Sequence, residues 1–238
     1  MENWLARTEL LIGRSGLDKL AAARVIVFGL GGVGSYAVEA LARCGVGHLV
    51  LVDFDRVAAS NINRQLHALT TTVGECKAAL MGERVKLINP RARVEIRAER
   101  YRPGSGESFL TPPPDGVIDA IDDVPAKVDL IKTCCRLDIP VFSSMGTGNK
   151  LDPGAFKVAD ISETRVCPLA RSVRRRLRRE GIVAGVTVVF STEEPHTYVP
   201  SGAAGESVPG SISFVPPVAG LLLAGAVVRR LLGAFPVK

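Results

Sequence analysis

The stretch that decides the fold is RVIVF at 24–28, GLGGVG at 29–34 and HLVLVD at 48–53, in that order. The first segment is a β-branched run typical of a buried strand, and it stops at a cluster of glycines. Helix formers with apolar residues at helical spacing fill 35–43, before the second β-branched run. Strand, glycine-rich turn, helix and strand form a βαβ unit, whose strands are parallel and whose crossover is right-handed. The sequence therefore predicts that the chain opens as a nucleotide-binding α/β fold.

Helix and strand patterns continue to alternate through the chain. After an irregular polar stretch at 56–72, they predict helices at 75–88 and 126–136, strands at 93–97, 116–121 and 140–145, and a loop at 104–114. Beyond residue 145 they predict strands at 155–161 and 186–191 and helices at 168–180 and 217–232. We expect a mostly parallel sheet with a mixed, partly antiparallel C-terminal part. Because no stretch has the composition of a flexible linker and no repeat period appears, we expect one domain over residues 1–238.

The composition is that of a globular chain with a mild basic excess. Of the 238 residues, 47% are hydrophobic, which is enough for a full core. The net charge of +6 favours polyanionic partners without identifying one. Residues 1–16 carry charges among short apolar pairs and lack the apolar core of a signal peptide, so we expect a cytoplasmic protein. The apolar run at 215–228 has 14 residues and is too short to span a bilayer, so we expect a buried or dimer-facing helix there.

The glycines at 29–34 fit the pattern G-x-G-x-x-G, follow a predicted strand and open a predicted helix. In that setting, backbone N–H groups and the helix N-terminus face a phosphate. Asp53 ends the second strand, where a carboxylate accepts hydrogen bonds from ribose hydroxyls. These features alone favour a nicotinamide or flavin dinucleotide over ATP, because that fingerprint is the commoner one. The structural alternative is a tight turn that binds no ligand.

Two cations that follow Asp53 favour a triphosphate instead. Arg64 lies in SNINRQ at 60–65, and Lys77 begins the next predicted helix. A guanidinium and an ammonium beside a glycine turn suit ATP, because charge develops on the α-phosphoryl group and on the departing pyrophosphate. A hydride-transfer enzyme has no need of them. In the alternative interpretation, Arg64 pairs with Asp53 or Asp55 and Lys77 is a solvated helix residue.

Three carboxylates lie at the end of the strand predicted at 116–121, at the edge where open α/β sheets bind ligands. These are Asp119, Asp122 and Asp123. An acid at this edge can hold the magnesium ion that accompanies ATP, and Asp122 is our candidate. The alternative is a helix N-cap, a role that Asp123 fits better because Val and Pro follow it.

Six motifs together resemble the adenylating core of ubiquitin-activating-enzyme-like proteins over residues 24–145: GLGGVGS, LVDFD, SNINRQ, GECK at 74–77, INP at 88–90 and DAIDD. Members of that superfamily share a Rossmann-like ATP-binding fold, activate a carboxylate as an acyl adenylate and usually work as dimers. The resemblance also implies that an N-terminal arginine, for which Arg7 is our candidate, reaches into the partner subunit's site.

Site residues follow from the same resemblance. Asp53 would hold the ribose, Asn61, Arg64 and Lys77 would contact the phosphates, and Asp122 would bind Mg²⁺. The implied catalytic residues are Arg64, Lys77 and Asp122. The implied ATP-binding set is Gly29, Gly31, Gly32, Gly34, Asp53, Asp55, Asn61, Arg64, Gln65 and Lys77.

Further motifs distinguish among members of the superfamily. NRQLHAL at 63–69, MGTGNKLDP at 145–153, VADISETRVCPLAR at 158–171, VFSTE at 189–193 and GSISFVPPVAG at 210–220 resemble the tRNA threonylcarbamoyladenosine dehydratases. This resemblance implies that ATP is used to cyclise a threonylcarbamoyl group on an adenosine beside the tRNA anticodon, with net loss of water. It leaves a monovalent cation and a cysteine desulfurase partner open.

The cysteines weigh against other members. The five of them form no C-x-x-C pair, whereas enzymes that adenylate a sulfur-carrier protein typically have a four-cysteine zinc site. None lies at 192–211, the loop expected to cross the active site, which disfavours transfer to an enzyme thiolate. An adenylyltransferase acting on the C-terminus of a ubiquitin-like sulfur carrier is nevertheless kept as the alternative. A non-enzymatic nucleotide sensor is a third hypothesis.

An arginine-rich helix offers a surface for tRNA. Residues 171–179 include six arginines. We assign no catalytic role to His67 and no role to the loop at 195–207. The alternative for the arginines is a solvated helix face. Four of them share one face of the predicted helix and could neutralise backbone phosphates: Arg171, Arg174, Arg175 and Arg178.

Overall fold

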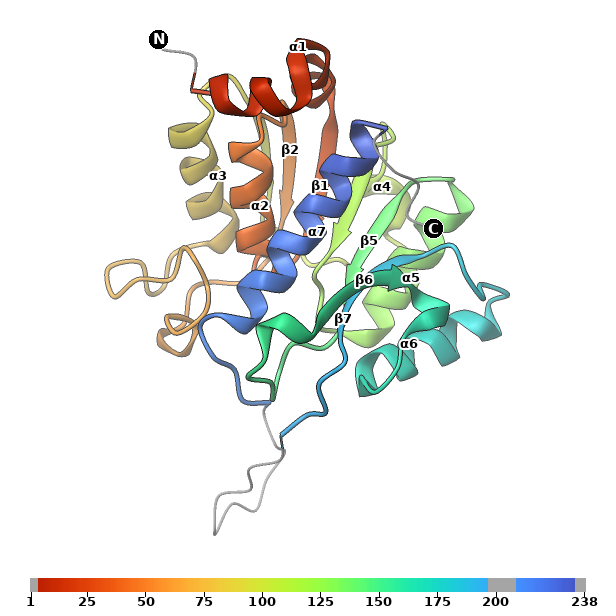
Figure 1. Cartoon of the computed structure of the whole chain (residues 1–238). Coiled ribbons are helices and arrows are strands. Elements are labelled where there is room, and N and C mark those ends of the chain that lie inside the picture. The colour runs from red at the N-terminus through yellow and green to blue at the C-terminus, as the bar shows by residue number, and fades with distance from the viewer. Residues whose placement is uncertain (1–3, 197–208, 234–238) are drawn as a thin grey trace.

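The computed structural model describes residues 4–196 and 209–233, which are built around a seven-stranded sheet (Figure 1). The strand order is β3-β2-β1-β4-β5-β7-β6, and every neighbouring pair is parallel except β6 with β7. The predicted α/β, Rossmann-like fold with a partly antiparallel C-terminal part is confirmed. The strands are β1 Arg24–Phe28, β2 His48–Val52, β3 Arg93–Arg97, β4 Gly116–Asp119, β5 Val141–Ser144, β6 Phe156–Asp160 and β7 Thr187–Ser191.

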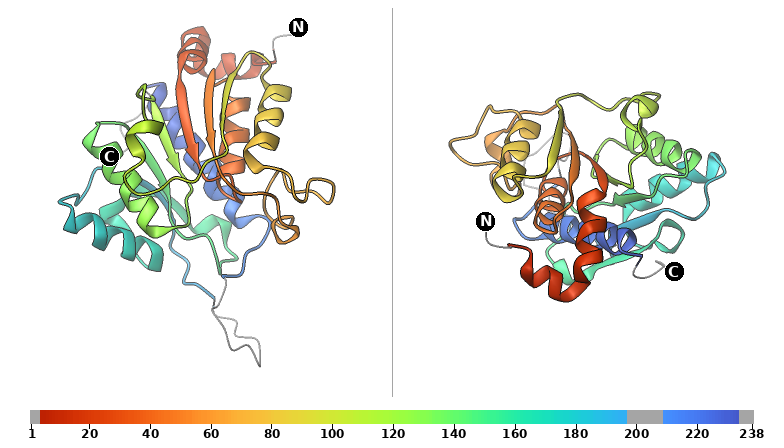
Figure 2. Two further views of the ribbon diagram at one scale, coloured as in Figure 1. Left: turned by 180° about the vertical axis from the view of Figure 1, so that it is seen from behind. Right: turned by 90° about the horizontal axis from the view of Figure 1, so that it is seen from above.

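Helices cover both faces of the sheet (Figures 1 and 2). One face carries α2, α3 and α7, and the other carries α4, α5 and α6. No helix in the described part of the chain combines the length and the apolar character needed to cross a membrane. The α-helices are α1 Ala6–Ala22, α2 Gly34–Arg43, α3 Lys77–Ile88, α4 Gly106–Phe109, α5 Val124–Arg136, α6 Pro168–Arg179 and α7 Val215–Leu231. Short 3-10 turns occur at η1 Ala59–Asn61, η2 Pro153–Ala155 and η3 Ile161–Glu163.

Alternate residues of each central strand pack into different cores. In β1, Val25 and Val27 pack into the core beneath α2, α3 and α7. Ile26 and Phe28 pack into the core beneath α5 and α6, and all four side chains are fully buried. A strand buried on both faces appears in the sequence as a continuous apolar run, which is why RVIVF and HLVLV were informative.

Two helices of the structure were not predicted from the sequence. Helix α1 was not predicted, because its apolar residues are interspersed with charges and it bends at Gly13, where φ is +69°. The 104–114 segment is not all loop, because α4 forms there. The ring of Phe109, at the end of α4, packs edge-on against the Phe28 ring with 5.6 Å between the ring centroids. A helix of four residues shows no periodicity in the sequence, and its place is determined by that tertiary contact.

Candidate nucleotide-binding site

A cavity of about 990 Å³ opens at the carboxyl ends of the parallel strands. It extends across the boundary between β1 and β4, where the direction of strand succession reverses and open α/β sheets bind ligands. Its volume is within the usual range for ligand pockets, roughly 300–1,000 Å³. Nine residues predicted from the sequence line it: Gly29, Gly31, Gly32, Asp53, Asp55, Arg64, Gln65, Lys77 and Asp122.

The glycines of the first turn have two different roles. Gly31 and Gly32 line the cavity, so their N–H groups lie near a bound ligand. A Cβ atom on Gly34 would lie 1.8 Å from the Gly29 carbonyl oxygen, so only glycine lets α2 begin this close to the strand. Gly29 itself has φ +83°, and its own Cβ would lie 2.6 Å from the Ala120 carbonyl oxygen. The pattern thus combines residues that expose the backbone with residues that permit close packing.

Asp53 is buried and held by the backbone on two sides. Its Oδ2 accepts a hydrogen bond of 2.6 Å from Leu30 N–H, and its Oδ1 accepts one of 2.8 Å from Asp55 N–H. Burial raises the pKa of the Asp53 carboxyl, and the two backbone donors oppose that rise. Each carboxylate oxygen keeps a further acceptor site, so Asp53 can still receive two ribose hydroxyls.

Lys77 and Arg64 are placed differently from what the alternative interpretation supposed. Lys77 is buried at the first position of α3, and its Nζ donates to Asp55 Oδ2 at 2.9 Å. Arg64 donates to the Ser60 carbonyl at 2.9 Å and to the Asn63 side-chain oxygen at 2.8 Å, and within the described residues it pairs with no carboxylate. Lys77 is therefore not a solvated residue, and the charge of Arg64 is left for a ligand.

The turn before these cations is organised by Asn61. Its side-chain oxygen accepts from Ala58 N–H at 3.0 Å, and its carbonyl accepts from Arg64 N–H and Gln65 N–H. Asn61 is not among the described residues that line the cavity, so its predicted phosphate contact remains a prediction. Gln65 does line the cavity, and its buried Oε1 has no hydrogen-bond partner within the described chain. That oxygen is available to a donor on a ligand.

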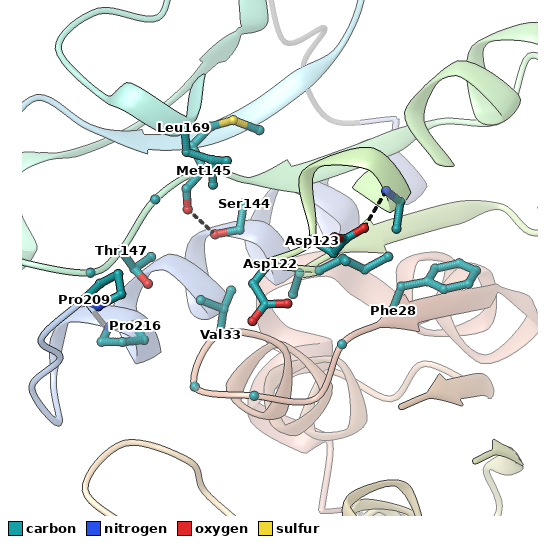
Figure 3. A pocket seen from close by; sticks show the side chains of 18 of the residues that line it. Phe28, Val33, Asp122, Asp123, Ser144, Met145, Thr147, Leu169, Pro209 and Pro216 are labelled. Carbon is teal, nitrogen blue, oxygen red and sulfur yellow. Dashed lines mark hydrogen bonds between the residues drawn. The ribbon is translucent and has the colours of Figure 1, made fainter. Parts of the chain in front are cut away.

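The three acids at the end of β4 and just after it differ in their hydrogen-bond partners. Asp119 is fully buried and accepts from Lys127 Nζ at 2.7 Å and from Ser143 Oγ at 2.6 Å. Asp123 accepts from Ala126 N–H at 2.9 Å and caps α5. Figure 3 shows the Asp122 carboxylate projecting into the cavity beside Val33. Of the three, Asp122 is the acid that lines the cavity without a cap or a buried ion pair, and its predicted role in holding Mg²⁺ stays a prediction.

The described residues include no group of three or more His, Cys, Asp or Glu side chains that could hold a metal ion by themselves. A Mg²⁺ site at Asp122 would therefore need the phosphates of the ligand to complete it, as is usual for this ion.

Sequence reasoning from single residues missed the other half of the cavity. Its wall is formed by 144–150 after β5, the start of α6 at 167–169, and 209–211. On the opposite side, Arg100 stacks over the Phe54 ring at 4.4 Å, and both residues line the cavity. The motifs in these segments were noticed only as a resemblance, because no residue in them has a chemistry that its local sequence reveals. Residues 197–208 of the unassigned loop lie outside the described chain.

The arginines of α6 divide into exposed and anchored side chains. Ala170, Val173 and Leu177 form the buried face of the helix. Arg174 is only half-exposed and donates to the Thr164 carbonyl at 2.8 Å and to the Thr164 hydroxyl. Of the four arginines predicted to bind tRNA, the remaining three are exposed: Arg171, Arg175 and Arg178.

Two further residues lie away from the cavity wall: Arg7, predicted to reach a partner subunit, and His67, to which we assign no catalytic role. Arg7 is exposed on α1, which precedes the amino end of β1, whereas the cavity lies at the carboxyl ends. A role for Arg7 in a partner subunit's site stays a prediction. His67 is buried, and neither ring nitrogen has a hydrogen-bond partner in the described chain. Burial, helped by the charge of Lys77, lowers the pKa of His67 to about 4, so the ring is neutral near pH 7.

A doubly wound sheet with a glycine turn, a backbone-held carboxylate and two cations at its carboxyl edge defines a Rossmann-like nucleotide-binding protein. More specifically, the ThiF family model matches residues 5–238, and the chain belongs to the ThiF family. The chain is 45% identical to a Bacillus subtilis (strain 168) tRNA threonylcarbamoyladenosine dehydratase, across 100% of this chain and 98% of that relative. It is 42% identical to the Escherichia coli (strain K12) dehydratase over 78% and 72% of the two chains.

Solved structures agree with these comparisons. The crystal structure of the E. coli dehydratase in complex with ATP has a TM-score of 0.88 and 36% identity, and the match covers 98% of this chain and 96% of that one. The complex of the same enzyme with AMP has a TM-score of 0.89. The predicted family is confirmed.

Proposed function

We propose that this chain is an ATP-dependent tRNA threonylcarbamoyladenosine dehydratase that acts through an acyl adenylate. The observation that carries the proposal is the similarity to the Bacillus enzyme along the whole chain. It is supported by the fold of the ATP-bound E. coli enzyme and by a cavity that brings together a glycine turn, a ribose-directed acid and two cations. The comparisons bear out the predicted activity and the predicted nucleotide.

The chemistry explains why ATP is needed. A free carboxylate is a poor electrophile, because substitution at its carbon would expel oxide. In the first step a carboxylate oxygen of the threonyl group attacks the α-phosphorus, a P–O bond forms and pyrophosphate leaves. In the second step the carbamoyl group attacks the activated carbon and loses a proton to solvent, AMP leaves with the former carboxylate oxygen, and a ring closes. Holding the two groups together favours this step without an enzyme nucleophile.

The residues of the cavity fit the first step. Asp53 would accept the ribose hydroxyls, and the turn at Gly31 and Gly32 would place N–H groups at the phosphates. Arg64 and Lys77 would stabilise the charge that develops on the α-phosphoryl group and on pyrophosphate. Asp122 would hold Mg²⁺, which would neutralise part of the phosphate charge when bound.

Binding of tRNA would use the exposed face of α6. Arg171, Arg175 and Arg178 lie on one side of the helix, whose first turn lines the cavity. Guanidinium groups there can contact backbone phosphates near the nucleoside in the site. A homodimer, a monovalent cation and a cysteine desulfurase partner stay predictions from the family resemblance, and a cytoplasmic location stays a prediction from residues 1–16.

The proposal is tested by following AMP and pyrophosphate formation with purified protein, ATP and Mg²⁺. Three additions are compared: tRNA bearing threonylcarbamoyladenosine, the same tRNA with unmodified adenosine, and a ubiquitin-like sulfur-carrier protein. We expect AMP to form only with the modified tRNA. AMP formed only with the carrier protein would instead support the adenylyltransferase alternative.

A further inference from the structure

Three lysines in the described chain are buried, and one of them forms no salt bridge with a described acid. Lys77 pairs with Asp55, and Lys127 pairs with Asp119. Lys150 is 3% exposed and lines the cavity, and its Nζ donates to the main-chain carbonyl of Glu193. The Lys150 charge helps to lower the pKa of the Glu193 carboxyl, but the hydrogen bond of its ammonium within the described chain goes to a neutral carbonyl, so the charge is only partly compensated.

The Glu193 carboxylate forms no salt bridge with Lys150, because it accepts hydrogen bonds from other groups. Glu193 Oε1 accepts from Leu151 N–H at 2.9 Å, and Oε2 accepts from Asp152 N–H at 3.0 Å. His196 Nε2 lies 2.9 Å from the same Oε1. The Glu193 carboxylate is thus occupied by the residues that follow Lys150, and within the described chain it forms no ion pair with the Lys150 ammonium. The ammonium has three donors, of which one is used by the Glu193 carbonyl, and Lys150 is among the residues that line the cavity.

The place of Lys150 in the sheet distinguishes it from the residues that face the nucleotide. The glycine turn follows β1, and Asp53 follows β2, whereas Lys150 lies in the segment after β5. Strand β4 separates β5 from β1, so the two chain segments start about 10 Å apart at the usual strand spacing. In Figure 3, Thr147 of the Lys150 segment lies across the cavity from Phe28 at the end of β1, with Asp122 between them. Lys150 therefore lines a part of the cavity away from the glycine turn and Asp53, where a second reactant has room beside a nucleotide bound at that turn.

We infer that Lys150 binds the carboxylate of the second substrate, the group that is to be adenylated, and so selects for a substrate that carries it. The inference rests on the proposed function. An ammonium in this place lets the enzyme distinguish modified from unmodified adenosine before any ATP is spent. It also neutralises the repulsion between an incoming carboxylate and the triphosphate.

The experiment measures binding of two anticodon stem-loop RNAs in the presence of α,β-methylene ATP. One RNA carries threonylcarbamoyladenosine and the other carries unmodified adenosine. Wild type should bind the modified RNA more tightly, and Lys150→Gln should lose this preference by about 10- to 100-fold, the range for a hydrogen bond to a charged group. Affinities of Lys150→Gln for the unmodified RNA and for the ATP analogue should not change. The matched control is Lys157→Gln, because Lys157 is an exposed residue of β6, and this variant should behave as wild type.

Two results would overturn the inference. Lys150→Gln could keep the full preference, or it could lose affinity for the ATP analogue instead, which would make Lys150 a phosphate contact. Glutamine can still donate to the Glu193 carbonyl, which favours folding of the variant. If the variant does not fold, the wild-type protein is tested with an RNA whose threonyl carboxylate is converted to the amide. We expect this RNA to bind more weakly than the natural one. Equal binding of the two RNAs would overturn the inference.

Failure of the wider proposal looks different. If the wild-type protein converts no modified RNA, the proposed function fails and this inference fails with it. If the wild type converts the RNA while Lys150→Gln discriminates as well as wild type, only the role of Lys150 is wrong.

Discussion

At the scale of single residues, His67 lies between Arg64 and Lys77 in the sequence but has a separate physical effect. Its pKa is lowered to about 4 by burial and by Lys77, against 6.5 for a free histidine. Between pH 6.5 and pH 4 the unfolded chain therefore binds a proton at this histidine, whereas the folded chain does not. The stability that comes from the neutral ring is complete above pH 6.5 and is lost as the pH falls toward 4.

Between pH 7 and pH 4, the free energy of unfolding should fall less for His67→Phe than for wild type. We expect the two decreases to differ by about 2 kcal/mol, a value that allows for solvent screening. The free energy of unfolding in urea, measured at a series of pH values, checks this. Parallel pH profiles for the two proteins would show that His67 is not buried as described.

Lys77 provides a second test at the same scale. Removing its charge by Lys77→Met should lower the rate of AMP formation by about 100-fold or more, as expected for a group that stabilises charge developing in the transition state. Lys86→Met is the matched control, because Lys86 lies exposed on the same helix. Steady-state kinetics with modified tRNA gives both numbers. Equal activities for the two variants would show that Lys77 does not take part in AMP formation.

At the scale of elements, two glycines of α7 offer a matched pair. A Cβ on Gly220 would lie 2.2 Å from the Val33 carbonyl oxygen, at the start of α2, whereas a Cβ on Gly225 would meet nothing within 4 Å. We expect Gly220→Ala to destabilise the protein by about 1–3 kcal/mol and to weaken ATP binding, because α2 begins at the glycine turn. Gly225→Ala should stabilise it by about 0.5–1 kcal/mol through helix propensity.

Urea unfolding and nucleotide titration of both variants check this pair. If Gly220→Ala were as stable as Gly225→Ala, helix α7 could not lie against α2 as described.

The anchored Arg174 and the exposed Arg175 of α6 should differ in their effects on stability and on tRNA binding. Arg174→Ala removes the hydrogen bonds to Thr164 and should cost about 1–3 kcal/mol of stability. Arg175→Ala should leave stability unchanged, weaken tRNA binding and reduce its dependence on salt. Thermal unfolding and RNA titration at several salt concentrations give the two readouts. A stability loss in Arg175→Ala with none in Arg174→Ala would contradict this assignment.

The elements also show what sequence patterns can reveal. The bounds of β1 and β2 were predicted correctly, because a strand buried on both faces and a glycine turn are local signals. Helix α7 begins at Val215, two residues before the predicted start, because Pro216 and Pro217 fit the first turn of a helix. By contrast, α4 depends on the contact of Phe109 with Phe28, which no local pattern contains.

At the scale of the whole molecule, the cavity joins a half that motifs predict and a half that they do not. Asp53, Arg64 and Lys77 come from one continuous stretch, and their chemistry is visible in the sequence. The other half depends on distant segments that meet only after folding. Asn149, for example, accepts from Gly210 N–H at 2.6 Å and donates its own N–H to the Gly210 carbonyl at 2.8 Å. Lys150 became interpretable only when its burial and its partners were known.

The measurement that tests the central claim most directly is nucleoside mass spectrometry of tRNA bearing threonylcarbamoyladenosine after incubation with the purified protein, ATP and Mg²⁺. We predict that the modified nucleoside loses the mass of one water, that the loss requires ATP, and that Arg64→Ala abolishes it. An unchanged nucleoside in the wild-type reaction, with AMP formed only when a sulfur-carrier protein is supplied, would contradict the account.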